Sequence, residues 1–317
     1  MLDNPSTKYP GLTVVIPLYN KRTTVGRALK SVLDQLDEGD RVIVVDDGSV
    51  DGSAEASANI NDPRLSVLSQ ENQGVSAARN RGIDAAQTEH VAFLDADDWW
   101  LSGAVSEFKR LFRKAPECIM SCVGHVRCAP GEVPEELQSP AGQEDEFLEG
   151  AAFIYAYSRE QLINSSAVCV KKTPLQEIGG FPEGVLSGED VYLWLRMALK
   201  GGVAVSRRRK AVIERAAPGP GSPTRDAVPF HVRWFSDSGN LKGMSRKDRK
   251  AVGHFIFYRG INMCAGEVMA KRRGNAIRQI RAITRIRPSF GFVGALIVIS
   301  PTGILKLLYS RKHSVKD

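Results

Sequence analysis

The sequence contains 317 residues, of which 43% are hydrophobic and 25% are charged, values that are ordinary for a globular protein. This composition excludes a disordered or fibrous chain. The net charge of +7 is unevenly distributed, because residues 200–317 hold 25 Lys and Arg against 6 Asp and Glu, whereas residues 1–199 hold 18 against 30. We therefore expect the two parts to meet different partners. The opening MLDNPSTKYP has neither the basic start nor the apolar core of a signal peptide, so we expect a cytoplasmic protein.

Four short apolar runs predict β-strands at residues 12–18, 41–46, 64–69 and 90–95. Their hydrophobicity is continuous rather than alternating, which is typical of strands buried on both faces. Residues 25–36 repeat apolar side chains at helical spacing, and residues 74–86 are rich in alanine, so both segments are predicted to be helices. The alternation predicts an α/β fold with a mainly parallel sheet flanked by helices. In such sheets, ligands bind at the carboxyl ends of the strands.

Polar side chains follow three of these strands. A tight Asp-Gly turn or a solvated turn would explain any one of these clusters alone. Because the carboxyl ends of parallel strands meet at one edge of the sheet, the three clusters together favour a ligand site. The residues concerned are Pro17, Tyr19 and Asn20 after the first strand, Asp46 and Asp47 after the second, and Asp95, Asp97 and Asp98 after the fourth.

The stretch HVAFLDADDWW suggests a metal site. Side chains alternate along a strand, so Asp95 and Asp97 point the same way with origins about 7 Å apart. Two carboxylates so placed can hold one hard cation against a diphosphate, and Mg²⁺ or Mn²⁺ suits that task. Asp98 is expected to face away and to support the pair.

The five cysteines are predicted to be reduced thiols, because their number is odd and no secretory signal is recognised. Cys118, Cys122, His125 and Cys128 lie within eleven residues and raise the alternative of a zinc site. An extended strand from Cys118 to Cys128 would run about 33 Å, too long for the ligands of one ion. Buried or edge-strand thiols are the better interpretation.

Glu189 and Asp190 open an apolar segment that is predicted to form a helix. Their negative charge is favourable at a helix N-terminus, which would explain them without any catalytic role. Residues 129–150 are acidic and rich in Pro and Gly, and we expect a surface loop there.

These features together resemble the family 2 glycosyltransferases, which have the GT-A fold. The resemblance covers most of the first 200 residues, and its motifs occur in the family's order and spacing. The motifs are VVIPLYN (14–20), VVDDGSVDGS (44–53), NQGVSAARNRGIDAA (72–86), FLDADDWW (93–100) and GGFPEGVLSGEDVYLWLRMAL (179–199).

The resemblance implies an inverting, hexosyltransferase-like enzyme that moves a sugar from a nucleotide-diphosphate sugar to an acceptor hydroxyl. Among nucleotide-diphosphate sugars, a UDP-sugar is the expected donor. The implied acceptor is a saccharide or lipid-linked saccharide, in cell-surface polysaccharide or glycolipid synthesis. The matched positions imply that Pro17, Tyr19 and Asn20 border the base, that Asp47 binds base or ribose, and that Arg79 lies on the nucleotide side. They further imply that Asp95 and Asp97 contact ribose and the metal-bound diphosphate, and that Asp46 and Ala96 complete the nucleotide-sugar site. Asp190 is implied to be the catalytic base.

The chain departs from the family pattern at one position. Many relatives carry a His some twenty-five residues after the Glu-Asp pair, which helps to hold metal or diphosphate. The corresponding stretch AVIERAAPGPGS (211–222) has none, and the next is His231. A catalytically inactive nucleotide-sugar-binding module is therefore an alternative. A sugar nucleotidyltransferase is another, although PLYNKRTT lacks the glycine-rich loop expected to hold a triphosphate.

The basic C-terminal part of the chain, residues 200–317, predicts a second region. We place the catalytic domain at residues 1–215 and a helical, membrane-associating region at 216–317. Residues 271–287 place many cations beside regularly spaced isoleucines, and residues 290–309 are strongly apolar but interrupted by Pro301, Gly303 and Lys306. We expect peripheral attachment to an anionic membrane at the inner face of the cell membrane, with a membrane span or a small core helix as alternatives. No interleaved aromatic motif supports nucleic acid as a partner.

Overall fold

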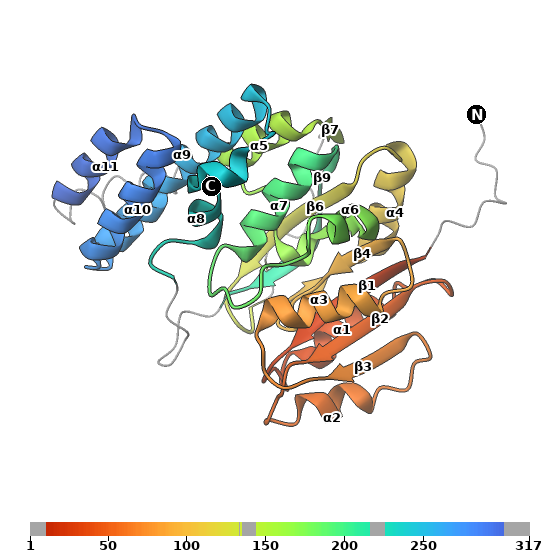
Figure 1. The fold of residues 1–317 in the computed structure, drawn as a ribbon. Helices are drawn as coiled ribbons and strands as arrows, with labels where there is room; N and C mark the ends of the chain where they lie inside the picture. The colour runs from red at the N-terminus through yellow and green to blue at the C-terminus, as the bar shows by residue number, and fades with distance from the viewer. Residues whose placement is uncertain (1–10, 133, 135–143, 216–225, 301–317) are drawn as a thin grey trace. The chain divides into compact units, whose positions relative to one another are not determined.

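Strands and helices alternate along the first part of the chain in the computed structural model, which describes residues 11–132, 134, 144–215 and 226–300. The predicted first and second strands form with the predicted bounds, and the third and fourth are one and two residues shorter (Figure 1). The elements in order are β1 (Leu12–Leu18), α1 (Val25–Leu33), β2 (Arg41–Asp46), α2 (Ser53–Ala58), β3 (Leu65–Ser69), α3 (Val75–Ala85), β4 (His90–Phe93), β5 (Trp99–Trp100) and α4 (Ala104–Lys114).

Nine strands of the described residues form one mixed sheet in the order β3-β2-β1-β4-β8-β6-β9-β5, with β7 paired to β9. The β3-β2-β1-β4 half is parallel, as predicted. In the other half, β8 is antiparallel to both β4 and β6, and β9 is parallel to β6 but antiparallel to β5 and β7. The remaining elements up to residue 214 are β6 (Met120–Cys128), β7 (Glu146–Leu148), α5 (Gly150–Arg159), the short helix η1 (Ser165–Ala167), β8 (Val168–Lys171), α6 (Lys172–Glu177), α7 (Glu189–Lys200) and β9 (Val203–Glu214).

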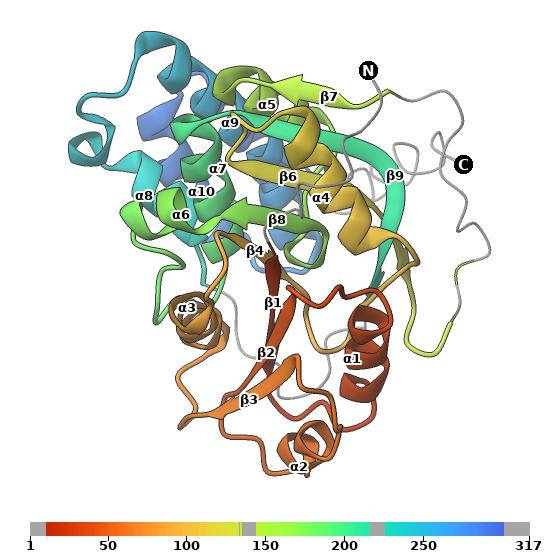
Figure 2. The same cartoon turned by 90° about the vertical axis from the view of Figure 1, so that its right-hand side faces the viewer.

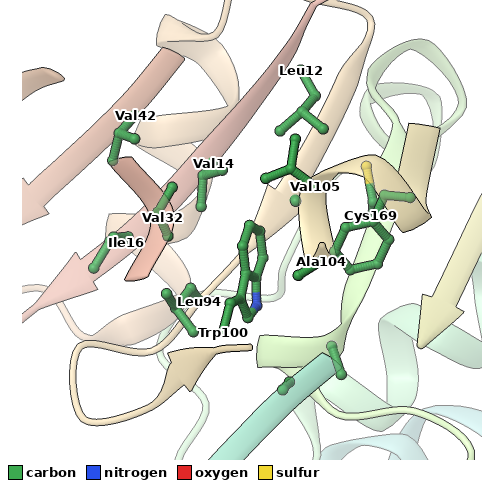
Figure 3. Packing of buried hydrophobic residues seen from close by; sticks show 14 of the residues in the cluster. Leu12, Val14, Ile16, Val32, Val42, Leu94, Trp100, Ala104, Val105 and Cys169 are labelled. Atoms are coloured by element: carbon green, nitrogen blue, oxygen red, sulfur yellow. The ribbon is translucent and has the colours of Figure 1, made fainter. Parts of the chain in front are cut away.

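Helices cover both faces of the parallel half. On one face, apolar side chains of β1 such as Leu12, Val14 and Ile16 belong to the same buried cluster as side chains of α1 and α4 (Figure 3). On the other face, α3 approaches so closely that a Cβ on Gly82 would lie 2.3 Å from Val15 Cγ1. Figure 2 shows α1 and α3 on opposite sides of β1 and β2. A strand buried on both sides explains why its sequence is apolar at nearly every position rather than at alternate ones.

The chain divides into two compact units that are discontinuous in sequence. The first comprises residues 1–150, 161–184 and 196–222, and the second comprises residues 151–160, 185–195 and 223–317. The whole sheet lies in the first unit. Helix α7 contributes its first seven residues to the second unit and its last five to the first. The predicted division of the chain at residue 215 stays a prediction.

The second unit is helical. Its elements after residue 225 are α8 (Phe230–Ser236), η2 (Ser238–Leu241), α9 (Arg246–Met269), α10 (Arg273–Ile286) and α11 (Phe290–Ile299). Small residues bring α9, α10 and α11 together, because a Cβ on Gly260 would lie 2.6 Å from Ile283 and one on Gly294 would lie 2.6 Å from Ile280. Within the described residues, none of the helices has the length and apolar character needed to cross a membrane. The second half of the apolar stretch 290–309 lies outside those residues.

Candidate active site

The parallel strands bring most of the predicted site residues to one edge of the sheet. The register of β1 and β2 pairs Leu18 with Asp46, and the next amide, Asp47 N, donates to Leu18 O at 2.8 Å. On the other side of β1, Leu94 N donates to Val15 O at 3.1 Å, so the chain after β4 begins beside β1. The loops that follow β1, β2 and β4 therefore leave the sheet at the same edge, as the strand pattern predicts.

The segment after β1 is joined to the loop after β2. Pro17 is buried within β1, whereas the Tyr19 side chain is 49% exposed. Asn20 has a φ of +50°, a left-handed conformation that asparagine tolerates better than most residues. Its backbone N–H donates to Ser49 Oγ at 3.0 Å, and its Oδ1 accepts from Val50 N at 2.9 Å. Asn20 therefore fixes the two loops, and its predicted contact with a base stays a prediction.

Asp47 organises the chain that leads into α3. The side chain is only 3% exposed, and its Oδ1 accepts from Gln73 N at 2.9 Å and from Gln70 Nε2 at 2.8 Å. Its Oδ2 accepts from Gly74 N at 2.8 Å. Both carboxylate oxygens thus already have protein donors, which holds this loop in place. The predicted contacts of Asp47 and of its buried neighbour Asp46 with a nucleotide remain untested.

Asp95 is paired with the buried Arg79 of α3. Arg79 Nη2 donates to Asp95 Oδ1 at 2.6 Å, and the guanidinium lies 5.1 Å from the ring centre of Phe181. Arg79 is 4% exposed, whereas the Asp95 side chain is 33% exposed. A rigid buried cation thus holds one oxygen of a carboxylate whose surface is partly open to solvent. The structure brings these two predicted residues together.

Asp97 is paired with Lys21, which is not one of the predicted site residues. Lys21 Nζ donates to Asp97 Oδ2 at 2.6 Å, and the two side chains are 43% and 32% exposed. Arg27 of α1 donates to Asp97 O and also to Glu214 Oε2, each at 2.8 Å. The signal was present in the sequence, because Lys21 directly follows the VVIPLYN motif at the same edge of the sheet.

Asp98 and Ser166 support the turn that carries Asp95 and Asp97. Ser166 Oγ accepts from Asp95 N at 3.0 Å and donates to Asp98 Oδ2 at 2.5 Å. Asp98 also accepts from Glu214 N at 2.8 Å. Burial, together with the nearby Asp95 and Asp97 charges, raises the pKa of Asp98 to about 8, which favours the protonated form. Protonation removes one charge from the cluster and so lowers the repulsion among the three carboxyl groups.

The donor set of Asp95 and Asp97 suits a magnesium or manganese ion that keeps open positions. Such an ion is often held by one or two carboxylates and completes its shell with water and substrate phosphate. Both carboxylates are about one third exposed, which leaves room for those ligands. In the described ranges, no group of three or more Asp, Glu, His or Cys is arranged to hold a metal. Two carboxylates are therefore the most that these residues would offer.

The cysteine cluster is not a zinc site within the described residues. All five cysteines are free and buried, and burial raises the pKa of Cys118 to about 11 and that of Cys122 to about 12. Thiols with such pKa values are poor ligands and poor nucleophiles at neutral pH. The interpretation as buried thiols is confirmed.

Asp190 lies in the second unit, in the first turn of α7. Its Oδ1 accepts from the adjacent Val191 N at 2.7 Å. The preceding Gly188 has a φ of +80°, and a Cβ there would lie 2.5 Å from His231 Nδ1. In the same segment, Phe230 N donates to Ser187 O at 2.9 Å. Helix α8 thus packs directly on the turn that precedes Asp190.

Comparisons with known proteins agree with the resemblance seen in the sequence. The model "Glycosyl transferase family 2" matches residues 13–162. The chain is 42% identical over 93 residues to the putative glycosyltransferase EpsH of Bacillus subtilis, covering 28% of this chain and 27% of that protein. It is 34% identical over 128 residues to the putative teichuronic acid biosynthesis glycosyltransferase TuaG of the same species, covering 39% of this chain and 50% of TuaG. The chain therefore spans between about a quarter and a half of these curated relatives.

A solved structure extends the likeness to nearly the whole chain. The crystal structure of S. aureus TarS 1-349 in complex with UDP-GlcNAc superimposes with a TM-score of 0.70 at 18% identity, covering 95% of this chain and 92% of that one. At that identity, the match establishes the fold alone. The predicted GT-A fold is thus confirmed, and the likeness to glycosyl transferase family 2 extends over residues 13–162.

Proposed function

We propose that this protein is an inverting glycosyltransferase that moves a sugar from a nucleotide-diphosphate sugar to an acceptor hydroxyl. The observation that carries the proposal is the pairing of two partly exposed carboxylates, Asp95 and Asp97, with the cations Arg79 and Lys21 at the carboxyl edge of the parallel half of the sheet. Such an edge is where α/β sheets bind nucleotides. The family match over residues 13–162 supports the same reaction.

The proposed donor is a UDP-sugar. Arg79 and Lys21 supply positive charge for the two phosphates, and Tyr19 offers an exposed ring two residues before Lys21. Solved structures of TarS include complexes with UDP-GlcNAc and with UDP, which supports the nucleotide but leaves the sugar of this protein open.

In the proposed reaction, Asp190 accepts the proton of the acceptor hydroxyl while that oxygen attacks the anomeric carbon. The new bond from carbon to the acceptor oxygen forms as the bond to the diphosphate oxygen breaks, and attack from the opposite side inverts the anomeric centre. A positioned base contributes roughly 10² to 10⁴ in rate. Asp95 and Asp97 would hold Mg²⁺ or Mn²⁺, which when bound offsets the negative charge that grows on the departing diphosphate.

We further propose that the enzyme works on a cell-surface polysaccharide or glycolipid at the inner face of the cell membrane. The name of its relative TuaG refers to teichuronic acid biosynthesis, which supports a polysaccharide. Within the second unit, α11 exposes Phe292 by 75% and Ile299 by 73%, and large exposed apolar side chains on a basic region favour peripheral attachment. A saccharide or a lipid-linked saccharide is the proposed acceptor.

The first test is a thermal-shift screen of nucleoside diphosphates and sugar nucleotides, with and without Mn²⁺. A ligand that binds only the folded state raises the melting temperature, so the preferred nucleotide should stand out. The selected donor is then incubated with the protein, and release of the nucleotide is measured. Slow hydrolysis of the donor without acceptor would support an active enzyme. Tight donor binding with no release, even with acceptors, would refute transfer and favour an inactive binding module.

A further inference from the structure

An arginine-lined cavity of about 310 Å³ lies in the second unit, between α8 and α10. Four arginines line it, together with Ser236 and small apolar side chains. They are Arg233 from α8 and Arg278, Arg281 and Arg285 from α10, and we call the cavity the arginine pocket.

The arginine pocket carries uncompensated positive charge. Arg233 donates to Asp226 at 3.0 Å. Among the described residues, no carboxylate forms an ion pair with Arg278, Arg281 or Arg285. The four arginines are exposed to solvent, which screens their mutual repulsion, and an anion in the cavity would interact favourably with all four charges.

The backbone around the arginine pocket is held in place by hydrogen bonds between its walls. Ser236 Oγ donates to Ala282 O at 2.9 Å, which joins the end of α8 to α10. Gln279, only 3% exposed, donates through Nε2 to Ala227 O at 3.0 Å. Positions 278, 281 and 285 are three and four residues apart, so these side chains share one face of α10. Three of the four cations therefore lie on one face of α10, and a hydrogen bond joins this helix to α8, which carries Arg233.

We propose that the arginine pocket binds a phosphate or diphosphate group. A planar guanidinium matches two oxygens of a phosphate at once and is never deprotonated in a protein, so several arginines around one cavity recognise phosphate by shape as well as by charge. The volume is enough for a diphosphate or a phosphorylated headgroup. This site lies wholly in the second unit and does not depend on the transferase activity.

The test is a calorimetric titration of the full-length protein with inorganic pyrophosphate at constant ionic strength. The pocket variant is Arg281→Gln with Arg285→Gln. Its matched control is Arg246→Gln with Lys250→Gln, which removes the same charge from exposed positions of α9 outside the cavity. Because hydrogen bonds to charged groups are strong, the pocket variant should bind at least about tenfold more weakly than the control. Any binding of pyrophosphate at the sheet edge contributes equally to both variants.

Equal affinity of the pocket variant and the control variant would overturn the proposal. A third variant, Arg281→Lys, keeps the positive charge but removes the planar guanidinium that can donate to two phosphate oxygens at once. Its affinity for pyrophosphate should lie between those of the control variant and the pocket variant. It also keeps the proposal testable if the double variant does not fold.

Sedimentation with vesicles identifies the source of the phosphate. Phosphatidylcholine vesicles with and without phosphatidic acid are mixed with the wild type, the pocket variant and the control. Loss of binding to the phosphatidic acid vesicles in the pocket variant alone assigns the site to a lipid headgroup. Equal sedimentation of both variants, with weaker pyrophosphate binding in the pocket variant, assigns it to a soluble phosphate.

Discussion

The hydroxyl of Ser166 is predicted to hold the turn that carries Asp95 and Asp97. Ser166 is fully buried, and its Oγ bridges Asp95 N at 3.0 Å and Asp98 Oδ2 at 2.5 Å. Its carbonyl also accepts from Trp100 Nε1 at 2.7 Å, a bond that survives replacement by alanine. The substitution Ser166→Ala therefore removes two hydrogen bonds and little else.

The expected cost follows from those two contacts. A net hydrogen bond contributes about 1 kcal/mol, and a buried donor left without a partner costs about 1–3 kcal/mol. Ser166→Ala leaves the Asp95 N–H unpaired and Asp98 with one donor fewer. We therefore expect the free energy of unfolding to fall by roughly 2–4 kcal/mol. Affinity for UDP should fall as well, because the turn that presents Asp95 and Asp97 loses its support.

Urea denaturation of Ser166→Ala and of the control Ser121→Ala tests this expectation. Ser121 is also fully buried in the first unit, but its Oγ makes a single long hydrogen bond, to Cys169 O at 3.4 Å. Ser121→Ala should cost no more than about 1 kcal/mol and leave UDP affinity unchanged. Similar losses of stability in the two variants would refute the role assigned to Ser166.

Three further predictions concern catalysis, pH dependence and membrane attachment. Asp190→Asn should retain donor binding but lose transfer by roughly 10² or more, whereas Asp97→Asn should lose both; normal transfer by Asp190→Asn would remove the base from the mechanism. Burial lowers the pKa of His231 to about 4 from an ordinary 6.5, so the unfolded chain binds a proton that the folded chain does not, and stability should fall as the pH drops from 6.5 to 4. In His231→Gln, the decrease in the free energy of unfolding between pH 6.5 and 4 should be smaller by roughly 3 kcal/mol. Urea titrations at several pH values measure this decrease, and the same decrease in the variant and the wild type would contradict the prediction. Replacing Phe292 and Ile299 with serine should weaken sedimentation with anionic vesicles in high salt, and undiminished sedimentation of the variant would show that these side chains do not contact the membrane.

The parallel half of the sheet could be predicted from the sequence because burial on both faces leaves a simple signature. Runs such as 12–18 and 41–46 are apolar at nearly every position, and the structure starts and ends β1 and β2 where the runs do. The carboxylates at the strand ends could be predicted for the same reason, since the strand end fixes the edge of the sheet on which they lie.

Of the mixed half, the sequence indicates an extended segment from Cys118 to Cys128, which overlaps β6, whereas charge interrupts the apolar pattern of β9. Strand β9 contains four consecutive basic residues, 207–210, which break the apolar run of a buried strand. In the folded chain, acidic partners far away in sequence pair with the first two of these residues. Arg207 pairs with Glu146 of β7 at 2.7 Å, and Arg208 pairs with Glu107 of α4 at 3.1 Å. Ser166 was missed on similar grounds, since it lies about seventy residues from the carboxylates that it supports.

The pairing of Asp97 with Lys21 leads to a specific prediction about metal binding at Asp97. The ammonium lies 2.6 Å from an oxygen that a divalent cation would need, so the two cations compete for Asp97. Lys21→Met should therefore raise the affinity of the unliganded protein for Mn²⁺. Because both side chains are substantially exposed, the pair contributes about 0.2–1 kcal/mol, which limits the gain to about fivefold.

The same substitution should weaken UDP binding in the absence of metal, because a cation is lost from the phosphate site. The matched control is Lys30→Met, which removes an equal charge from α1, where Lys30 pairs with Asp34 at 2.8 Å. Calorimetric titration with Mn²⁺ alone, and with UDP in a chelator, separates the two effects. If Lys21 and the metal ion compete for Asp97, Lys21→Met should raise the affinity for Mn²⁺ and lower the affinity for UDP, and Lys30→Met should change neither. A loss of Mn²⁺ affinity in Lys21→Met would show that the ion binds elsewhere.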